Sequence, residues 1–138
     1  MRRMDKLIRY LWASPCSLIG LVLGAIPLLL GGRLGSAHGT LEITYRSCPA
    51  DCGKFARSMR FRGICFGHVI LAVTREELAR IGPHERVHVR QYELWGILFF
   101  PAYAASSLWQ LVRGRSPYHD NCFEIQARER SRNETLVN

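Results

Sequence analysis

The chain has 138 residues, a formal net charge of +8 and a hydrophobic fraction of 48%, which fits one domain with a single core and leaves too little chain for two. The excess of positive charge favours an anionic partner, either nucleic acid or the headgroups of acidic lipids. No nucleic-acid-binding module is legible, and the basic residues between the two apolar blocks described below are scattered instead of forming one stripe. We therefore expect membrane lipid, and no nucleic acid, as the partner.

The N-terminal segment has the pattern of a membrane anchor. Residues 1–10 are basic, and residues 11–30 carry no charge over a length that can span the hydrocarbon core as a helix. A cleaved signal peptide ending near Ala37 is the alternative. The apolar stretch is longer than the usual signal core and contains Pro27, so we favour a retained anchor and assign residues 1–37 to the basic N-terminus and anchor helix.

A second apolar block covers residues 94–112, and we expect a second apolar helix there. It is either a buried core helix or, together with the first block, a shallow or re-entrant hairpin that leaves both flanks on one side of the membrane. The arginine-rich segment between the blocks leaves the orientation open.

Two strands are predicted between the apolar blocks. Leu41, Ile43 and Tyr45 alternate with polar residues, which is typical of a short strand. Residues 48–53 have the composition of a turn, and residues 64–73 form an apolar, β-branched run that indicates a buried strand.

Helix signals follow the second strand. Thr74 with Glu77 three residues later is a capping-box pattern, which predicts a short helix ending at Gly82. Pro83 suits the first position of a further helix, which should continue to about Trp95 and stop at Gly96.

This further helix carries the sequence His84-Glu85-Arg86-Val87-His88, a match to H-E-x-x-H. A spacing of four residues places both imidazoles on one helix face, so that both can reach a single ion. Glu85 lies beside them, where its carboxylate can hold a water molecule and act as a general base. The motif predicts a metal site on the helix, against the alternative of two solvated histidines.

A zinc site needs a third protein ligand, and we favour Glu124 at the start of a helix that follows the second apolar block. The alternative for Glu124 is a capping box with Asn121, in which the glutamate bonds back to the cap amide. His119 is the reserve ligand.

The motif HERVH followed by Asn-x-x-Glu-x-x-Ala resembles the gluzincin arrangement of zinc metallopeptidases. The stretches GHVI (67–70), HERVHVRQYELWG (84–96), FFPAY (99–103) and YHDNCFEIQAR (118–128) are similar to a group of small bacterial proteins with an apolar N-terminal segment, and the similarity covers about two thirds of the chain.

The resemblance implies an α+β fold with a minimal zincin-like core, in which a small sheet lies over the H-E-x-x-H helix. It also implies His84, His88 and Glu124 as zinc ligands and Glu85 as base. The expected organisation is an anchor over residues 1–37, a metal-binding domain over 38–132 that includes the apolar helix 94–112, and a tail over 133–138. The expected location is a bacterial inner membrane.

The function expected from these residues is that of a membrane-associated, zinc-dependent metallopeptidase-like hydrolase acting on a peptide or protein. Tyr118, His119 and His68 are the candidates for stabilising the oxyanion. Two histidines and a carboxylate also suit Fe²⁺, although the adjacent Glu85 favours zinc.

The cysteines supply a rival site. Cys48, Cys52, Cys65 and His68 have intervals compatible with a Cys₃His structural zinc site, although Cys65 and His68 fall in the predicted strand. A non-catalytic, zinc-stabilised membrane adaptor is the second functional class. With five cysteines in all, reduced thiols are expected, and a Cys48–Cys52 bridge is the alternative if that loop faces an oxidising compartment.

Overall fold

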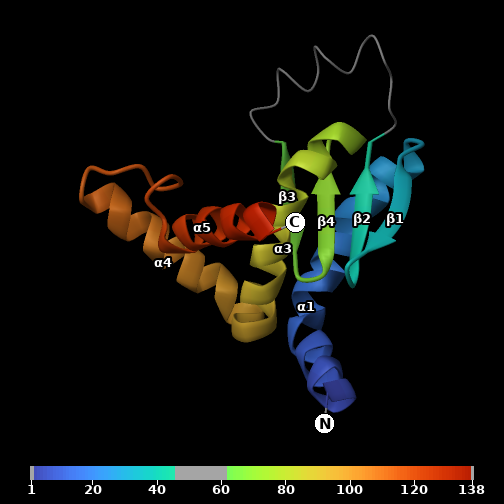
Figure 1. The fold of residues 1–138 in the computed structure, drawn as a ribbon, viewed down its shortest axis with the longest axis horizontal. Coiled ribbons are helices and arrows are strands. Elements are labelled where there is room, and N and C mark those ends of the chain that lie inside the picture. Colours follow the sequence, from blue (N-terminus) through green and yellow to red (C-terminus); the bar gives the residue numbers. More distant parts are fainter. Residues whose placement is uncertain (1, 46–61, 138) are drawn as a thin grey trace.

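The computed structural model describes residues 2–45 and 62–137, which form an α+β fold (Figure 1). The expected α+β class is confirmed. In chain order the elements are helix α1 (Arg2–Leu29), strands β1 (Arg33–Ala37), β2 (Thr40–Thr44), β3 (Gly63–Phe66) and β4 (Val69–Ala72), helix α3 (Arg75–Trp95), the 3₁₀ turn η1 (Gly96–Leu98), and helices α4 (Phe99–Val112) and α5 (Cys122–Val137).

The four strands form one sheet in the order β1-β2-β4-β3. β2 and β4 are parallel, whereas β1 and β3 are antiparallel to their neighbours. The strand expected around Leu41 and Ile43 is confirmed as β2. Residues 33–37, which we assigned to the anchor segment, form β1 and pair with β2, so the chain directly after the apolar helix is part of the sheet. The domain boundary at residue 37 stays a prediction.

The single strand predicted over residues 64–73 is wrong, because these residues form the hairpin of β3 and β4. The chain reverses at Gly67, whose φ of 57° is the left-handed conformation that glycine adopts readily. A Cβ there would lie 2.3 Å from the Ser17 hydroxyl oxygen of α1. The apolar residues on both sides of the turn concealed the reversal, since neither strand contains an exposed residue.

The prediction of two helices separated at Gly82 is also wrong, because α3 is continuous from Arg75 to Trp95 with Pro83 inside it. The predicted ends are confirmed: the Thr74 hydroxyl accepts a hydrogen bond from the Glu77 amide, and Gly96 ends the helix. A proline costs an internal helix one hydrogen bond. Helix α3 packs against β3, β4 and α5, and this packing favours the continuous helix despite that cost.

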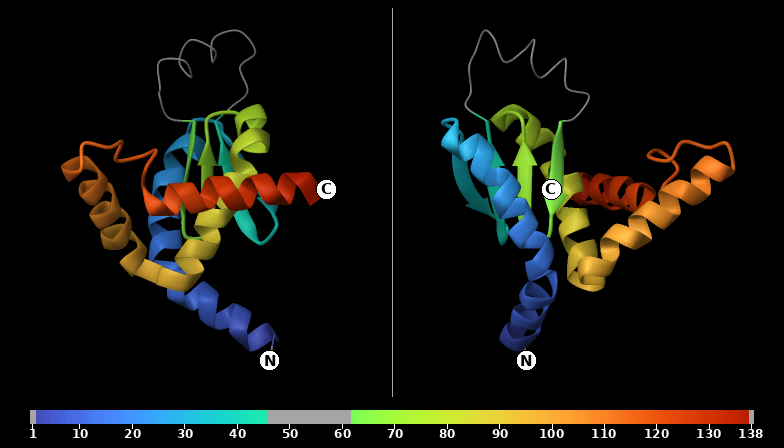
Figure 2. Two further views of the ribbon diagram at one scale, coloured as in Figure 1. Left: turned by 60° about the vertical axis from the view of Figure 1, so that its left-hand side comes forward. Right: turned by 180° about the vertical axis from the view of Figure 1, so that it is seen from behind.

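Helix α1 covers the sheet face opposite α3 (Figures 1 and 2). The close approach depends on two glycines: a Cβ on Gly20 would lie 2.7 Å from Cβ of Val69, and one on Gly24 would lie 2.3 Å from Cδ1 of Ile43. Within the described residues, α1 is the helix that is long and apolar enough to cross a membrane by length and composition, a test that a core helix or a signal sequence also passes.

The second apolar block is broken. Leu94 and Trp95 end α3, residues 96–98 form η1, and the apolar helix α4 begins at Phe99 instead of at Leu94. Gly96, with φ of 56°, lets the Trp12 indole of α1 pack directly on the turn. Seen from behind, α1 and α4 diverge from η1 as the two arms of a V (Figure 2).

Candidate metal centre

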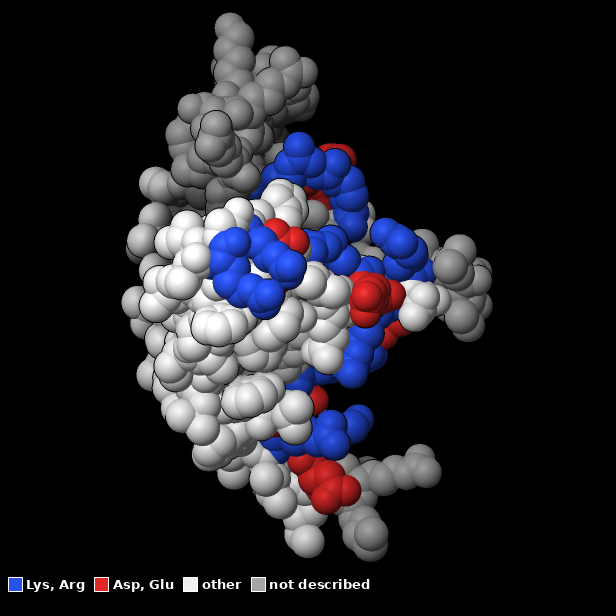
Figure 3. Space-filling view, turned by 90° about the vertical axis from the view of Figure 1, so that its left-hand side faces the viewer, with Lys and Arg blue, Asp and Glu red and all other residues white. Residues whose placement is uncertain are grey.

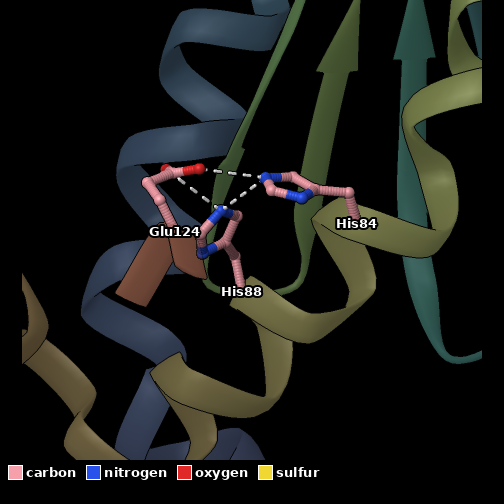
Figure 4. A group of neighbouring side chains, drawn as sticks. All are labelled: His84, His88 and Glu124. Atoms are coloured by element: carbon pink, nitrogen blue, oxygen red, sulfur yellow. Dashed lines mark hydrogen bonds and ion pairs between the residues drawn. The ribbon is translucent and has the colours of Figure 1, made fainter. Parts of the chain in front are cut away.

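Helix α3 presents the metal motif on the face that α5 covers. Val87 and Val89 are buried, which fixes the rotation of the helix. His84 and His88 then point toward the first turn of α5 (Figure 4). His88 and Glu85 are buried, whereas the His84 side chain keeps about 20% of its surface exposed.

Helix α5 is positioned by Asn121, which is fully buried. Its side-chain amide donates to the Tyr103 carbonyl and to the Ser107 hydroxyl of α4, and its side-chain oxygen accepts from the Phe123 amide. Asn121 therefore caps α5, but Glu124 does not complete the alternative capping box. The Glu124 carboxylate instead points at the histidines (Figure 4).

His84, His88 and Glu124 form a cluster that could hold a metal ion. The two imidazole Nε2 atoms lie 3.1 Å apart, and the Glu124 oxygens lie 3.2 Å from Nε2 of His84 and 3.3 Å from Nε2 of His88. Ligand atoms around a tetrahedral zinc ion, each bonded at about 2.0–2.1 Å, are separated by about 3.3 Å. The separation of the two imidazole nitrogens is close to this value. The two carboxylate distances belong to different Glu124 oxygens, and with one ligand atom from each residue the three atoms lie within 4.8 Å of one another, a grouping that could hold one ion.

Gln91 orients His88, and our sequence reasoning missed it. Its side-chain oxygen accepts from Nδ1–H of His88 at 2.8 Å, while its amide donates to the Phe123 carbonyl and to the Gln126 oxygen. Because the Phe123 carbonyl can only accept, the Gln91 NH₂ group must point toward it and the Gln91 oxygen toward His88. Nδ1 of His88 therefore carries the proton, and Nε2 presents its lone pair to the cluster. The spacing signal was present, since Gln91 lies three residues after His88 on the same helix face.

Tyr103 supports Glu124, donating its hydroxyl hydrogen bond to the carboxylate at 2.9 Å. No spacing rule connects an α4 tyrosine to a glutamate of α5, so the sequence held no signal for this contact. Gln91 and Tyr103 together constrain one histidine and the carboxylate, which is the outer-shell support typical of metal ligands.

The charges of the cluster are complementary. Burial acts to raise the pKa of Glu124, but hydrogen bonds from His84 and His88 outweigh burial and leave that pKa far below its usual 4.5. Burial acts to lower the pKa of His88, and the Glu124 carboxylate outweighs it in turn, so the pKa of His88 is raised above 6.5. The Glu124 carboxylate therefore favours positive charge at the histidines, which a bound cation would supply.

Glu85 borders a cavity of about 840 Å³ that also reaches His84, His88 and Glu124. Residues of β3, α3, α4 and α5 line the cavity, and aromatic residues such as Phe99 are among them. Burial raises the pKa of Glu85, and the positive histidines partly oppose this effect. A carboxyl group with a raised pKa beside a metal cluster is suited to accept and return a proton.

Of the three residues predicted to stabilise an oxyanion, two lie at the cavity and one does not. Tyr118 and His119 line the cavity, and burial together with the Glu124 charge raises the pKa of Tyr118 to about 12, so its hydroxyl stays a donor at neutral pH. His68 lies elsewhere, stacked on Tyr10 with its Nε2 3.2 Å from Glu93. His119 takes no part in the ligand cluster.

The rival cysteine site is only half described, because Cys48 and Cys52 lie outside the described residues. Cys65 is buried in β3 with its thiol 3.3 Å from the Gly67 carbonyl. Burial, followed by the charge of Glu85, raises its pKa well above 9.0. The Cys₃His site therefore stays a prediction.

Comparison with protein-family models, with curated proteins and with solved structures gives no match for this chain.

Proposed function

We propose that the chain binds zinc through His84, His88 and Glu124 and hydrolyses peptide bonds with Glu85 as general base. The observation that carries the proposal is the grouping of two histidine nitrogens and one carboxylate oxygen within 4.8 Å of one another, beside the buried Glu85 and a cavity. The minimal zincin-like core belongs to this proposal and rests on α3 lying against the small sheet.

The division of roles follows the geometry. Bound zinc supplies a Lewis acid that lowers the pKa of a water ligand and polarises a carbonyl oxygen. Glu85 accepts the proton of the attacking water and returns it to the leaving amine. Tyr118, which lines the cavity, donates a hydrogen bond to the developing oxyanion in this proposal, with His119 as the alternative donor.

A peptide substrate is favoured by the edge of the sheet. β3 is the last strand in the order, it lines the cavity, and its outer edge has no partner strand among the described residues. An extended peptide can add to such an edge through its main chain and place a carbonyl near the cluster. The aromatic walls favour apolar side chains on either side of the cleaved bond.

The test is zinc-loaded full-length protein in detergent, assayed on a mixture of quenched fluorescent peptides. Glu85→Gln should keep its zinc and lose about 10²–10⁴ of the rate, whereas the exposed Glu129→Gln on α5 should keep both zinc and rate. Hydrolysis unaffected by Glu85→Gln would contradict the assigned base. Loading with Fe²⁺ under anaerobic conditions separates the two metals.

A zinc site that only stabilises the fold is the second candidate, because its ligands come from α3 and α5 and would tie these helices together. In that case the zinc-loaded protein cleaves nothing, and Glu85→Gln raises stability because it removes a buried ionisable group with a raised pKa.

A further inference from the structure

The surface made by α1, η1 and α4, here called the V face, is apolar over most of its area. No charged residue occurs in residues 10–32 or 94–112. Figure 3 shows a broad uncharged surface along one side of the molecule, interrupted by one basic cluster, with most of the charged residues toward the other side. Exposed apolar side chains of these elements include Leu11, Leu18, Val22, Leu98, Leu108 and Trp109.

The border of the V face is basic. Lys6 and Arg9 precede the charge-free part of α1, and Arg113 and Arg115 follow α4, all four exposed. The Arg113 guanidinium lies over the Trp109 ring, 5.7 Å from its centre. An apolar surface bordered by arginine, lysine and tryptophan matches the apolar interior, interface and anionic headgroups of a bilayer.

The packing of α1 argues against a helix that crosses the membrane upright. Its middle and C-terminal parts dock on β2 and β4 through Gly20 and Gly24. An upright α1 would carry this sheet into the hydrocarbon, including Arg33 of β1 and Glu42 of β2, at a high cost for each charge. Lying along the surface, α1 can bury its outer apolar face and leave the sheet in water.

We propose that the V face docks on one leaflet of an anionic bilayer, with α1 and α4 both lying in the lipid interface. The metal cavity is lined by β3, α3, α4 and α5, so α4, one of the two helices that dock on the lipid, forms one of its walls. Resting on the proposed function, this arrangement makes the substrate a polypeptide segment at the lipid surface.

Tryptophan fluorescence tests the docking directly, because all three tryptophans lie at or beside the V face. Trp12 is in α1, Trp95 ends α3, and Trp109 is in α4. The full chain is reconstituted into vesicles of phosphatidylcholine and phosphatidylglycerol whose acyl chains carry bromine near the headgroup. A variant with Trp12→Phe and Trp95→Phe reports on α4 alone. Its matched control replaces all three tryptophans with phenylalanine and adds Arg130→Trp on the exposed side of α5.

Bromolipid should quench most of the Trp109 emission and protect it from aqueous iodide, and the α5 control should behave in the opposite way. Trp109 open to iodide in vesicle-bound protein would overturn the proposal, because α1 alone would then be the anchor. Lipid quenching of both reporters would also overturn it, because the molecule would then be immersed.

If the substituted background fails to fold, as judged by circular dichroism, the native three-tryptophan chain is compared with its Arg130→Trp variant, which adds the α5 reporter. Nearly all of the native emission should be quenched by bromolipid, and the variant should add emission that iodide quenches and bromolipid does not. Repeating the measurement with His88→Ala separates this proposal from the metal proposal, since docking requires no metal and should be unchanged.

Discussion

Replacing Gln91 with methionine removes the group that orients His88 while keeping the length of the side chain. In the structure Gln91 accepts the His88 Nδ1–H bond at 2.8 Å and donates to the Phe123 carbonyl at 3.1 Å. Loss of such an outer-shell partner typically weakens metal binding about 10–100-fold, which corresponds to about 1.4–2.7 kcal/mol. The buried groups left unpaired should also lower the free energy of unfolding by about 1–3 kcal/mol.

The assay is a competition titration in detergent between the protein and a chromophoric zinc chelator, on samples whose fold is verified by circular dichroism. Gln126→Met is the matched control, because the Gln126 side-chain oxygen accepts from the Gln91 amide at 2.9 Å, whereas the hydrogen bond to His88 Nδ1 is made by Gln91. It should bind zinc nearly as tightly as wild type. A folded Gln91→Met protein with wild-type zinc affinity would refute the orienting role of Gln91.

Three further predictions concern the charges of Glu124 and His88 in the metal-free protein, the N-terminal cap of α3 and the packing of α1 on the sheet. The pKa of Glu124 is lowered on folding, so its contribution to the free energy of unfolding is complete above pH 4.5 and is lost as the pH falls through the lower pKa of the folded state. The pKa of His88 is raised on folding, so its contribution is complete below pH 6.5 and is lost as the pH rises through the higher pKa of the folded state. Thermal unfolding in EDTA should therefore show maximal stability between these limits, and a flat profile for wild type, or one unchanged in Glu124→Gln, would contradict this pairing. Thr74→Ala should lower the free energy of unfolding, measured with denaturant, by about 1 kcal/mol, because it removes the N-terminal cap of α3. Thr74→Ser should keep most of that stability. Equal stability of the two variants would contradict the capping role. Gly20→Val should lower the free energy of unfolding by about 1–3 kcal/mol, because the new side chain overpacks against Val69. Gly35→Ala is the control and should be nearly neutral, since its added Cβ has only one atom nearby, at 3.9 Å. Equal denaturation midpoints for the two variants would mean that α1 does not dock as described.

The candidate site was largely predictable because it depends on local spacing. His84 and His88 share a helix face through their spacing of four, and Asn121 marks the helix start that places Glu124. Tyr103 could not be predicted, because its contact with Glu124 depends on how α4 lies against α5.

The errors in the fold have a common physical origin. Gly67 was read as part of one buried strand because both flanking segments are apolar, and only the φ of 57° reveals the turn. Pro83 was read as a helix start because a local rule favours that position, whereas packing on the sheet keeps α3 continuous through it. Tertiary contacts decided both cases, and no pattern within a short window contains them.

Metal content tests the central claim most directly. Zinc is measured by elemental analysis on purified wild type beside Glu124→Gln and the exposed Glu129→Gln of the same helix. We expect about one zinc per chain in wild type and in Glu129→Gln, and a loss of most of it in Glu124→Gln. Full zinc retention in folded Glu124→Gln, or a wild-type chain that binds no metal, would contradict the proposed centre of His84, His88 and Glu124.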